Sequence, residues 1–154
     1  MGLGDYLTLE SIEHDMSARC KRDVLSQIAS LAAKHTNVAA KDVEAALMAR
    51  EKLGSTGVGH GVAIPHGKIE GLDRICALFV KLEQPLAFDA LDDEPVDLVF
   101  VLLAPEEATA AHLKALAKVT RLLRDGSTRD ALRGAETAEA MFAIVTETTR
   151  VDAA

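Results

Sequence analysis

Apolar side chains recur at helical spacing in two stretches of the first third of the chain. Residues 17–35 carry one such stripe, and residues 41–53 carry a second that ends before Gly54, a residue type that often stops a helix. The pattern predicts two amphipathic helices that lead into a glycine-rich segment. The positions that define them are Val24, Leu25, Ile28, Leu31 and Ala32 in the first helix and Val43, Ala46 and Leu47 in the second.

The apolar runs that follow are typical of strands. They occupy residues 62–64, 74–82 and 96–103, and in the last run every residue except Asp97 is apolar. A nearly continuous run of this kind is typical of a central strand that is covered on both faces. Residues 84–95 contain two prolines and several carboxylates, which favours a loop with a short edge strand.

Helical spacing returns in the last third of the chain. It predicts a helix over residues 109–124 and another over 137–148, and between them Ser127 and Asp130 form a capping-box pattern that opens a short helix. Helices before, between and after the strands indicate an α/β fold. We therefore expect one three-layer domain over residues 1–154, in which a mixed β-sheet is flanked by helices on both faces. The stripe of the first of these helices consists of Leu113, Leu116, Val119 and Leu123.

Composition narrows the classes of partner and compartment. The net charge of −7 and the absence of a Lys/Arg tract argue against binding to nucleic acid or to an anionic membrane. No apolar stretch reaches membrane-spanning length, so direct membrane insertion is not expected. Cys20 and Cys76 fall in a predicted helix and a predicted strand, which favours reduced core thiols in a cytoplasmic protein over a disulfide.

The segment from Gly54 to Lys68 holds the strongest candidate chemistry. It contains five of the ten glycines and two histidines, and it presents His66 between Pro65 and Gly67. Because proline restricts its own φ and that of the residue before it, a short strand is expected to end here. Gly67 would then allow a sharp exit, so the pattern predicts an imidazole displayed on a stiff turn.

Several catalytic patterns fail on spacing. A Walker loop needs four residues between its glycines and Ser or Thr after its lysine, whereas five residues separate Gly61 from Gly67 and Ile69 follows Lys68. A dinucleotide fingerprint must open a helix, and no helix is predicted directly after this segment. Zinc held by His60, His66 and His112 is an alternative, but the chain has no paired His or Cys ligand spacing. No nucleophile elbow is present for a serine or cysteine mechanism.

Histidine itself is the remaining nucleophile, because a neutral imidazole can attack a phosphoryl group near neutral pH. Arg50 offers a planar fork of donors for the resulting oxyanions. Between Arg50 and Lys68 three cations face one carboxylate, in a chain that is otherwise acidic. His112 lies on the apolar stripe of its helix near the N-terminal end, where it is either a satisfied core histidine or a ligand group.

Four blocks of the chain together resemble a known family. They are residues 49–67, ending in Ile-Pro-His-Gly, then Phe88-Asp-Ala, then Pro95-Val-Asp-Leu-Val-Phe-Val-Leu-Leu-Ala-Pro105, then His112-Leu-Lys-Ala-Leu-Ala-Lys-Val. In order and spacing they are similar to the fructose/mannitol-type enzyme IIA domains of the bacterial phosphotransferase system. The likeness is closest to the nitrogen-regulatory branch.

The resemblance implies a site, a partner and a mode of action. His66 would accept a phosphoryl group from a histidine phosphocarrier protein, with His112 as second active-site histidine and Arg50 as the stabilising cation. Such a protein-to-protein phosphotransferase uses no cofactor and no metal. It would act on regulatory targets, a sensor kinase or a transporter among them, in nitrogen, carbon or potassium metabolism. The alternatives are a sugar-specific enzyme IIA that serves a separate permease component, and a binding module gated by phosphorylation.

Overall fold

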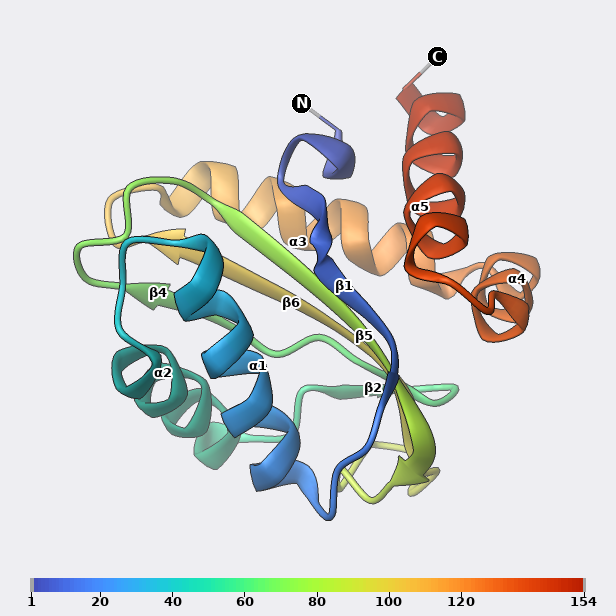
Figure 1. Cartoon of the computed structure of the whole chain (residues 1–154), viewed down its shortest axis with the longest axis horizontal. Coiled ribbons are helices and arrows are strands. Elements are labelled where there is room, and N and C mark those ends of the chain that lie inside the picture. The colour runs from blue at the N-terminus through green and yellow to red at the C-terminus, as the bar shows by residue number, and fades with distance from the viewer. Residues whose placement is uncertain (1, 154) are drawn as a thin grey trace.

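A mixed β-sheet forms the centre of the computed structural model, which describes residues 2–153, with side chains up to residue 147 (Figure 1). The sheet order is β1-β5-β6-β3-β2, and β4 pairs with β6. Strands β1 and β5 are parallel, as are β3 and β4 with β6, whereas β5 and β6 are antiparallel. The strands are β1 (Leu7–Met16), β2 (Gly57–Gly59), β3 (Val62–Ala63), β4 (His66–Ile69), β5 (Cys76–Leu86) and β6 (Val96–Pro105).

Helices cover both faces of this sheet, which confirms the expected α/β architecture. Helices α1 and α2 lie on one side, and α3, α4 and α5 lie on the other (Figure 1). A short 3-10 turn, η1, precedes β1. The bounds are η1 (Leu3–Asp5), α1 (Lys21–His35), α2 (Ala40–Leu53), α3 (Thr109–Arg124), α4 (Gly126–Gly134) and α5 (Ala138–Ala153). No helix in the described part of the chain is long and apolar enough to cross a bilayer.

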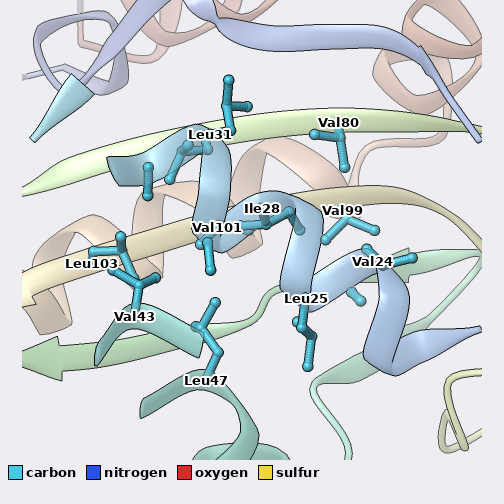
Figure 2. Close-up of a cluster of buried hydrophobic side chains, with 14 of the residues drawn as sticks. Val24, Leu25, Ile28, Leu31, Val43, Leu47, Val80, Val99, Val101 and Leu103 are labelled. Atoms are coloured by element: carbon cyan, nitrogen blue, oxygen red, sulfur yellow. The ribbon is translucent and has the colours of Figure 1, made fainter. Parts of the chain in front are cut away.

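Strand β6 is the central strand that its apolar run predicts. Val99 and Val101 pack into the layer of α1 and α2, whereas Phe100 and Leu102 pack into the layer of α3 and α5. Figure 2 shows the first of these layers, where side chains from α1 and α2 meet those of β5 and β6. Leu47 of α2 is 1% exposed there, and burying a leucine of this kind stabilises the fold by about 1.5–3 kcal/mol.

Strand β1 has no counterpart in the sequence prediction. Its buried apolar residues, Leu7, Ile12 and Met16, are five and four positions apart, so the alternation of a half-buried strand is missing. The register against β5 shifts between Leu7 and Ile12. Within that irregular stretch Ser11 Oγ donates to Thr8 O at 2.9 Å and accepts from Thr8 N at 3.1 Å. This bulge breaks the alternation of apolar and polar residues, so the sequence pattern does not predict the strand.

Helix α1 begins later than predicted, and the prediction that Cys20 is a core residue within this helix is wrong. It starts at Lys21, with Cys20 at the N-cap, and Cys20 is exposed rather than part of the core. Cys76 is buried in β5 as predicted, and burial raises the pKa of its thiol. Both cysteines are free.

Two further element predictions are wrong in detail. Asp125, rather than Ser127, is the N-cap of α4, where its side chain accepts from Thr128 N at 3.1 Å. Residues 84–86 continue β5, and Leu86 pairs with Val96, so the segment holds no separate edge strand. The helix predicted over residues 109–124 is confirmed, although Leu113 of its stripe is 62% exposed.

Candidate active site

His66 opens strand β4 directly after a buried segment. Ile64 N donates to Thr56 O at 2.9 Å, and Leu102 N of β6 donates to Pro65 O at 3.1 Å. These bonds fix the two residues before His66, and the strand register then pairs His66 with Leu102. The side chain of His66 is half-buried.

The predicted turn at this histidine is wrong. Gly67 continues β4, and the next glycine with a left-handed backbone is Gly71, at φ 83°. A Cβ at Gly67 would lie 3.7 Å from the Cβ of Ala46 on α2, which is an ordinary contact. His66 is therefore held by strand pairing rather than by a turn.

One hydrogen bond determines the tautomer of His66. Its Nδ1 lies 2.8 Å from Ile64 O. Because a carbonyl oxygen only accepts, Nδ1 must carry the proton. The neutral ring then keeps its lone pair on Nε2. The nitrogen able to act as a nucleophile is consequently Nε2.

His112 lies beside His66, on the first turn of α3. The two ring centroids are 5.8 Å apart, with an angle of 68° between the ring planes. His112 is 5% exposed, and its Nε2 has no hydrogen-bond partner among the described residues. A buried polar atom without a partner costs about 1–3 kcal/mol. The structure therefore brings together two of the three predicted site residues and leaves one of their nitrogens unsatisfied.

Burial lowers the pKa of His112, and the nearby positive charges of His66 and Lys68 lower it further. A lowered pKa keeps the imidazole neutral at neutral pH. In that form its ring has one N–H donor and one acceptor nitrogen. His112 consequently offers polar groups without a fixed charge.

Lys68 also points toward α3. Its Nζ donates to Thr109 Oγ1 at 2.5 Å, and Thr109 is the first residue of that helix. The sequence prediction counted Lys68 only as part of the local positive charge. The signal that could have singled it out is its spacing from His66, because residues two apart in a strand share a face.

Arg50, the third predicted residue, is on the last turn of α2, the helix that packs on β4 through Ala46 and Gly67. Its Nη1 donates to Gly54 O at 2.7 Å, just beyond the end of the helix. That bond engages one of the five N–H groups of the guanidinium. A role for Arg50 at a phosphoryl group stays a prediction.

His60 belongs to another part of the molecule. It lies in the turn between β2 and β3 with φ 58°, and its backbone N donates to Asp92 Oδ2 at 3.0 Å. Gly59 and Gly61, on either side, also have positive φ values of 101° and 78°. These glycines thus serve a tight hairpin. Among the described residues no three His, Cys, Asp or Glu side chains gather closely enough to hold a metal ion.

Comparison with known proteins decides the family. The family model described as "Phosphoenolpyruvate-dependent sugar phosphotransferase system, EIIA 2" matches residues 5–148. The chain belongs to this enzyme IIA family. A nitrogen regulatory protein of Bradyrhizobium diazoefficiens is 44% identical to this enzyme IIA over 145 residues, which cover 94% of the chain and 95% of the relative.

Solved structures agree with the assignment. The nitrogen regulatory protein IIA-Ntr of Neisseria meningitidis matches this enzyme IIA with a TM-score of 0.89 and 39% identity, over 93% of the chain and 98% of the relative. The mannitol IIA of Escherichia coli shares the fold, with a TM-score of 0.77 and 21% identity over 90% of the chain and 97% of the relative. The predicted resemblance to the enzyme IIA family is confirmed. As expected, similar proteins include nitrogen regulatory proteins.

A buried ion pair in this enzyme IIA is connected by hydrogen bonds to the segment before His66. The sequence pattern did not predict this pair. Glu51 is 8% exposed, and one of its oxygens lies 2.9 Å from Lys21 Nζ. Its carboxylate also accepts from Thr56 N at 3.2 Å and from Thr56 Oγ1. Thr56 O in turn accepts from Ile64 N, and Ile64 O binds His66. The sequence gave no indication of this ion pair, because Lys21 and Glu51 are 30 residues apart and lie in two different predicted helices.

Proposed function

We propose that this enzyme IIA is a phosphoryl carrier that accepts a phosphoryl group on His66 from a histidine phosphocarrier protein. The observation that carries the proposal is the hydrogen bond from Nδ1 to Ile64 O, at 2.8 Å, because it leaves the lone pair on Nε2. The His112 ring, 5.8 Å away, adds a second polar group beside the acceptor nitrogen. Membership of the family supports the same chemistry.

In the proposed step, the Nε2 lone pair of His66 attacks phosphorus. The N–P bond of the donor's phosphohistidine breaks, and its electron pair returns to the donor ring. The Nδ1 proton of His66 stays in its bond to Ile64 O, so the carbonyl stabilises the positive charge that the phosphorylated ring acquires. Because the donor already carries an activated phosphoryl group, the transfer needs no nucleotide, metal or other cofactor.

The other two predicted residues would bind the phosphoryl oxygens. His112 has a buried nitrogen without a partner, and an N–H at that nitrogen would find its acceptor in a phosphoryl oxygen. Arg50 has N–H groups beyond the one that binds Gly54 O. If both act this way, His112→Ala and Arg50→Ala should retain the fold and accept the phosphoryl group more slowly. Unchanged rates in both variants would remove them from the site.

The regulatory branch is the setting we propose for this carrier. Its support is the 44% identity to a nitrogen regulatory protein along 94% of the chain. A phosphoryl group adds roughly 1.5–2 negative charges, enough to change how the surface around His66 meets a regulatory target such as a sensor kinase or transporter. We place this activity in the cytoplasm, where a single domain over residues 1–154 would meet the phosphocarrier.

A labelling experiment tests the carrier function. The protein is incubated with phosphoenolpyruvate, the general enzyme of the system and the phosphocarrier, and acid-labile phosphate is measured. We expect label on the wild type, none on His66→Ala, and full label on His60→Ala, because His60 is an exposed turn residue. Persistence of the label in His66→Ala would refute the assignment.

A further inference from the structure

Lys68 shares the site face of strand β4 with His66. Side chains two apart in a strand point to the same face, at about 6.6 Å along the strand. The register agrees, because the intervening Gly67 faces Ala46 of α2, and Ile69 belongs to the core of the α1 and α2 layer. Lys68 therefore projects toward α3, as His66 does.

A hydrogen bond holds the ammonium near the second histidine. Lys68 Nζ binds Thr109 Oγ1 at 2.5 Å, and His112 follows Thr109 by three residues, on the same side of α3. The charge of Lys68 reaches His112, whose pKa it lowers. His66, His112 and Lys68 thus surround one small region beside the N-terminus of α3.

That region has three features that suit an anion. The N-cap residue Ala108 provides no side-chain cap, so the first amides of α3 are not satisfied from there. The buried Nε2 of His112 has no partner among the described residues, and Lys68 supplies a positive charge. Helix amides, an imidazole and an ammonium are together a set of donors for a phosphoryl group.

We propose that Lys68 is a phosphoryl-binding residue of this site, held by Thr109 so that its ammonium donates to an oxygen of the phosphoryl group on His66. The inference rests on the proposed function, since it requires phosphorylation of His66. It adds a cation that approaches from the strand itself. Arg50 by contrast approaches from α2, where it is bound to Gly54 O.

The alternative role for Lys68 is docking of an acidic donor surface. The two roles differ in what remains once the donor has left. A docking lysine affects the concentration of phosphocarrier needed for transfer, and has no effect on the phosphoryl group of the isolated phosphoprotein. A phosphoryl-binding lysine lowers the pKa of that group and shifts the transfer equilibrium toward the enzyme IIA.

The experiment compares Lys68→Gln, Lys68→Arg and the matched charge control Lys52→Gln, which alters an exposed lysine of α2. Each protein is equilibrated with phosphorylated phosphocarrier, and the phosphorylated fraction is measured. For Lys68→Gln we expect the equilibrium constant to fall about twofold to fivefold, the effect of one charge-assisted hydrogen bond from an exposed lysine. Lys68→Arg should retain most of the wild-type value, and Lys52→Gln should match the wild type.

A phosphorus NMR titration of the isolated phosphoproteins supplies the second readout. In Lys68→Gln the pKa of the phosphoryl group should rise by about 0.5–1 unit, because a neighbouring positive charge has been removed. An unchanged equilibrium constant together with an unchanged phosphoryl pKa would overturn the role of Lys68 while leaving His66 phosphorylation intact. Loss of label on the wild type would instead refute the proposed function itself.

Discussion

One polar cluster contacts the segment before His66 and another contacts His66 itself, and the fold satisfies the first and not the second. In the first, the side chain of Glu51 is 4% exposed, and Lys21 and Thr56 donate hydrogen bonds to it. In the second, His112 is 5% exposed and keeps a nitrogen without a partner among the described residues. Since the chain saturates a buried carboxylate so near to the site, the unpaired nitrogen of His112 does not reflect poor packing. The difference leads us to expect that Glu51 contributes to stability and that His112 binds a ligand, as proposed above.

Removing Glu51 should produce the largest effect on stability. Glu51→Ala leaves Lys21, Thr56 N and Thr56 Oγ1 without their common acceptor. Breaking a buried pair typically costs about 3–5 kcal/mol, and because Lys21 is 20% exposed we expect a loss near the lower end, about 3 kcal/mol. Urea denaturation of wild type and variant measures the difference.

Glu44→Ala is the control for this experiment, because Glu44 lies on the same helix and, among the described residues, is not part of the network of Lys21, Glu51 and Thr56. It should change the free energy of unfolding by less than about 0.5 kcal/mol. A loss of similar size in both variants would mean that Glu51 acts only through general charge or helix propensity, and the contrast between the two clusters would disappear.

The opposite substitution should separate stability from activity. His112→Leu removes the unpaired nitrogen and keeps an apolar side chain on the buried stripe, so the variant should be more stable by about 1 kcal/mol. Phosphoryl acceptance should fall about tenfold or more, the effect of losing one hydrogen bond to a charged group. Thermal unfolding and the rate of labelling measure the two effects. A variant that is less stable and equally active would identify His112 as an ordinary core residue.

The sequence singled out His66 and His112 as candidates from local patterns, although for His112 the pattern left a core histidine and a ligand group both open until the family resemblance was added. His66 follows a proline in a specific block, and His112 interrupts an apolar stripe, which is visible within one helix. Glu51 and Thr56 carried no such signal, because their importance comes from Lys21, thirty residues earlier than Glu51. Strand β1 was not predicted for a related reason, since a bulge at Thr8 and Ser11 breaks the alternation of apolar and polar residues. Local periodicity thus predicts faces, whereas contacts between distant segments appear only in the fold.

A smaller effect should follow from Thr56→Val, which removes the hydroxyl donor to Glu51 but keeps the backbone donor. We expect a loss of about 1–1.5 kcal/mol, the contribution of one hydrogen bond to a charged group. Because both residues belong to one network, the double variant with Glu51→Ala should lose less than the sum of the single losses. Denaturation of the four proteins of this cycle gives the coupling energy, and strict additivity would show that the hydroxyl contributes independently of the carboxylate.

The smallest effect concerns pH and also originates at His112. Its pKa is lowered in the folded protein, mainly by burial and further by His66 and Lys68, whereas in the unfolded chain it has the ordinary value of about 6.5. As the pH falls below about 6.5, the unfolded chain binds a proton at His112 before the folded protein does. The stability contributed by neutral His112 is therefore fully present above about pH 6.5, and it is lost as the pH falls from there to the lowered pKa of the folded protein.

The slope in that window is at most about 1.4 kcal/mol per pH unit. Urea denaturation of wild type and His112→Leu at a series of pH values measures it, because the histidines that do not interact with His112 cancel in the difference. The advantage of His112→Leu over the wild type should be constant above about pH 7.5 and should grow as the pH falls below about 6.5. A difference that stays constant over the whole range would show that His112 binds its proton equally well in the folded and unfolded states. The folded protein would then provide a partner for the protonated ring, and His112 would resemble the saturated cluster at Glu51.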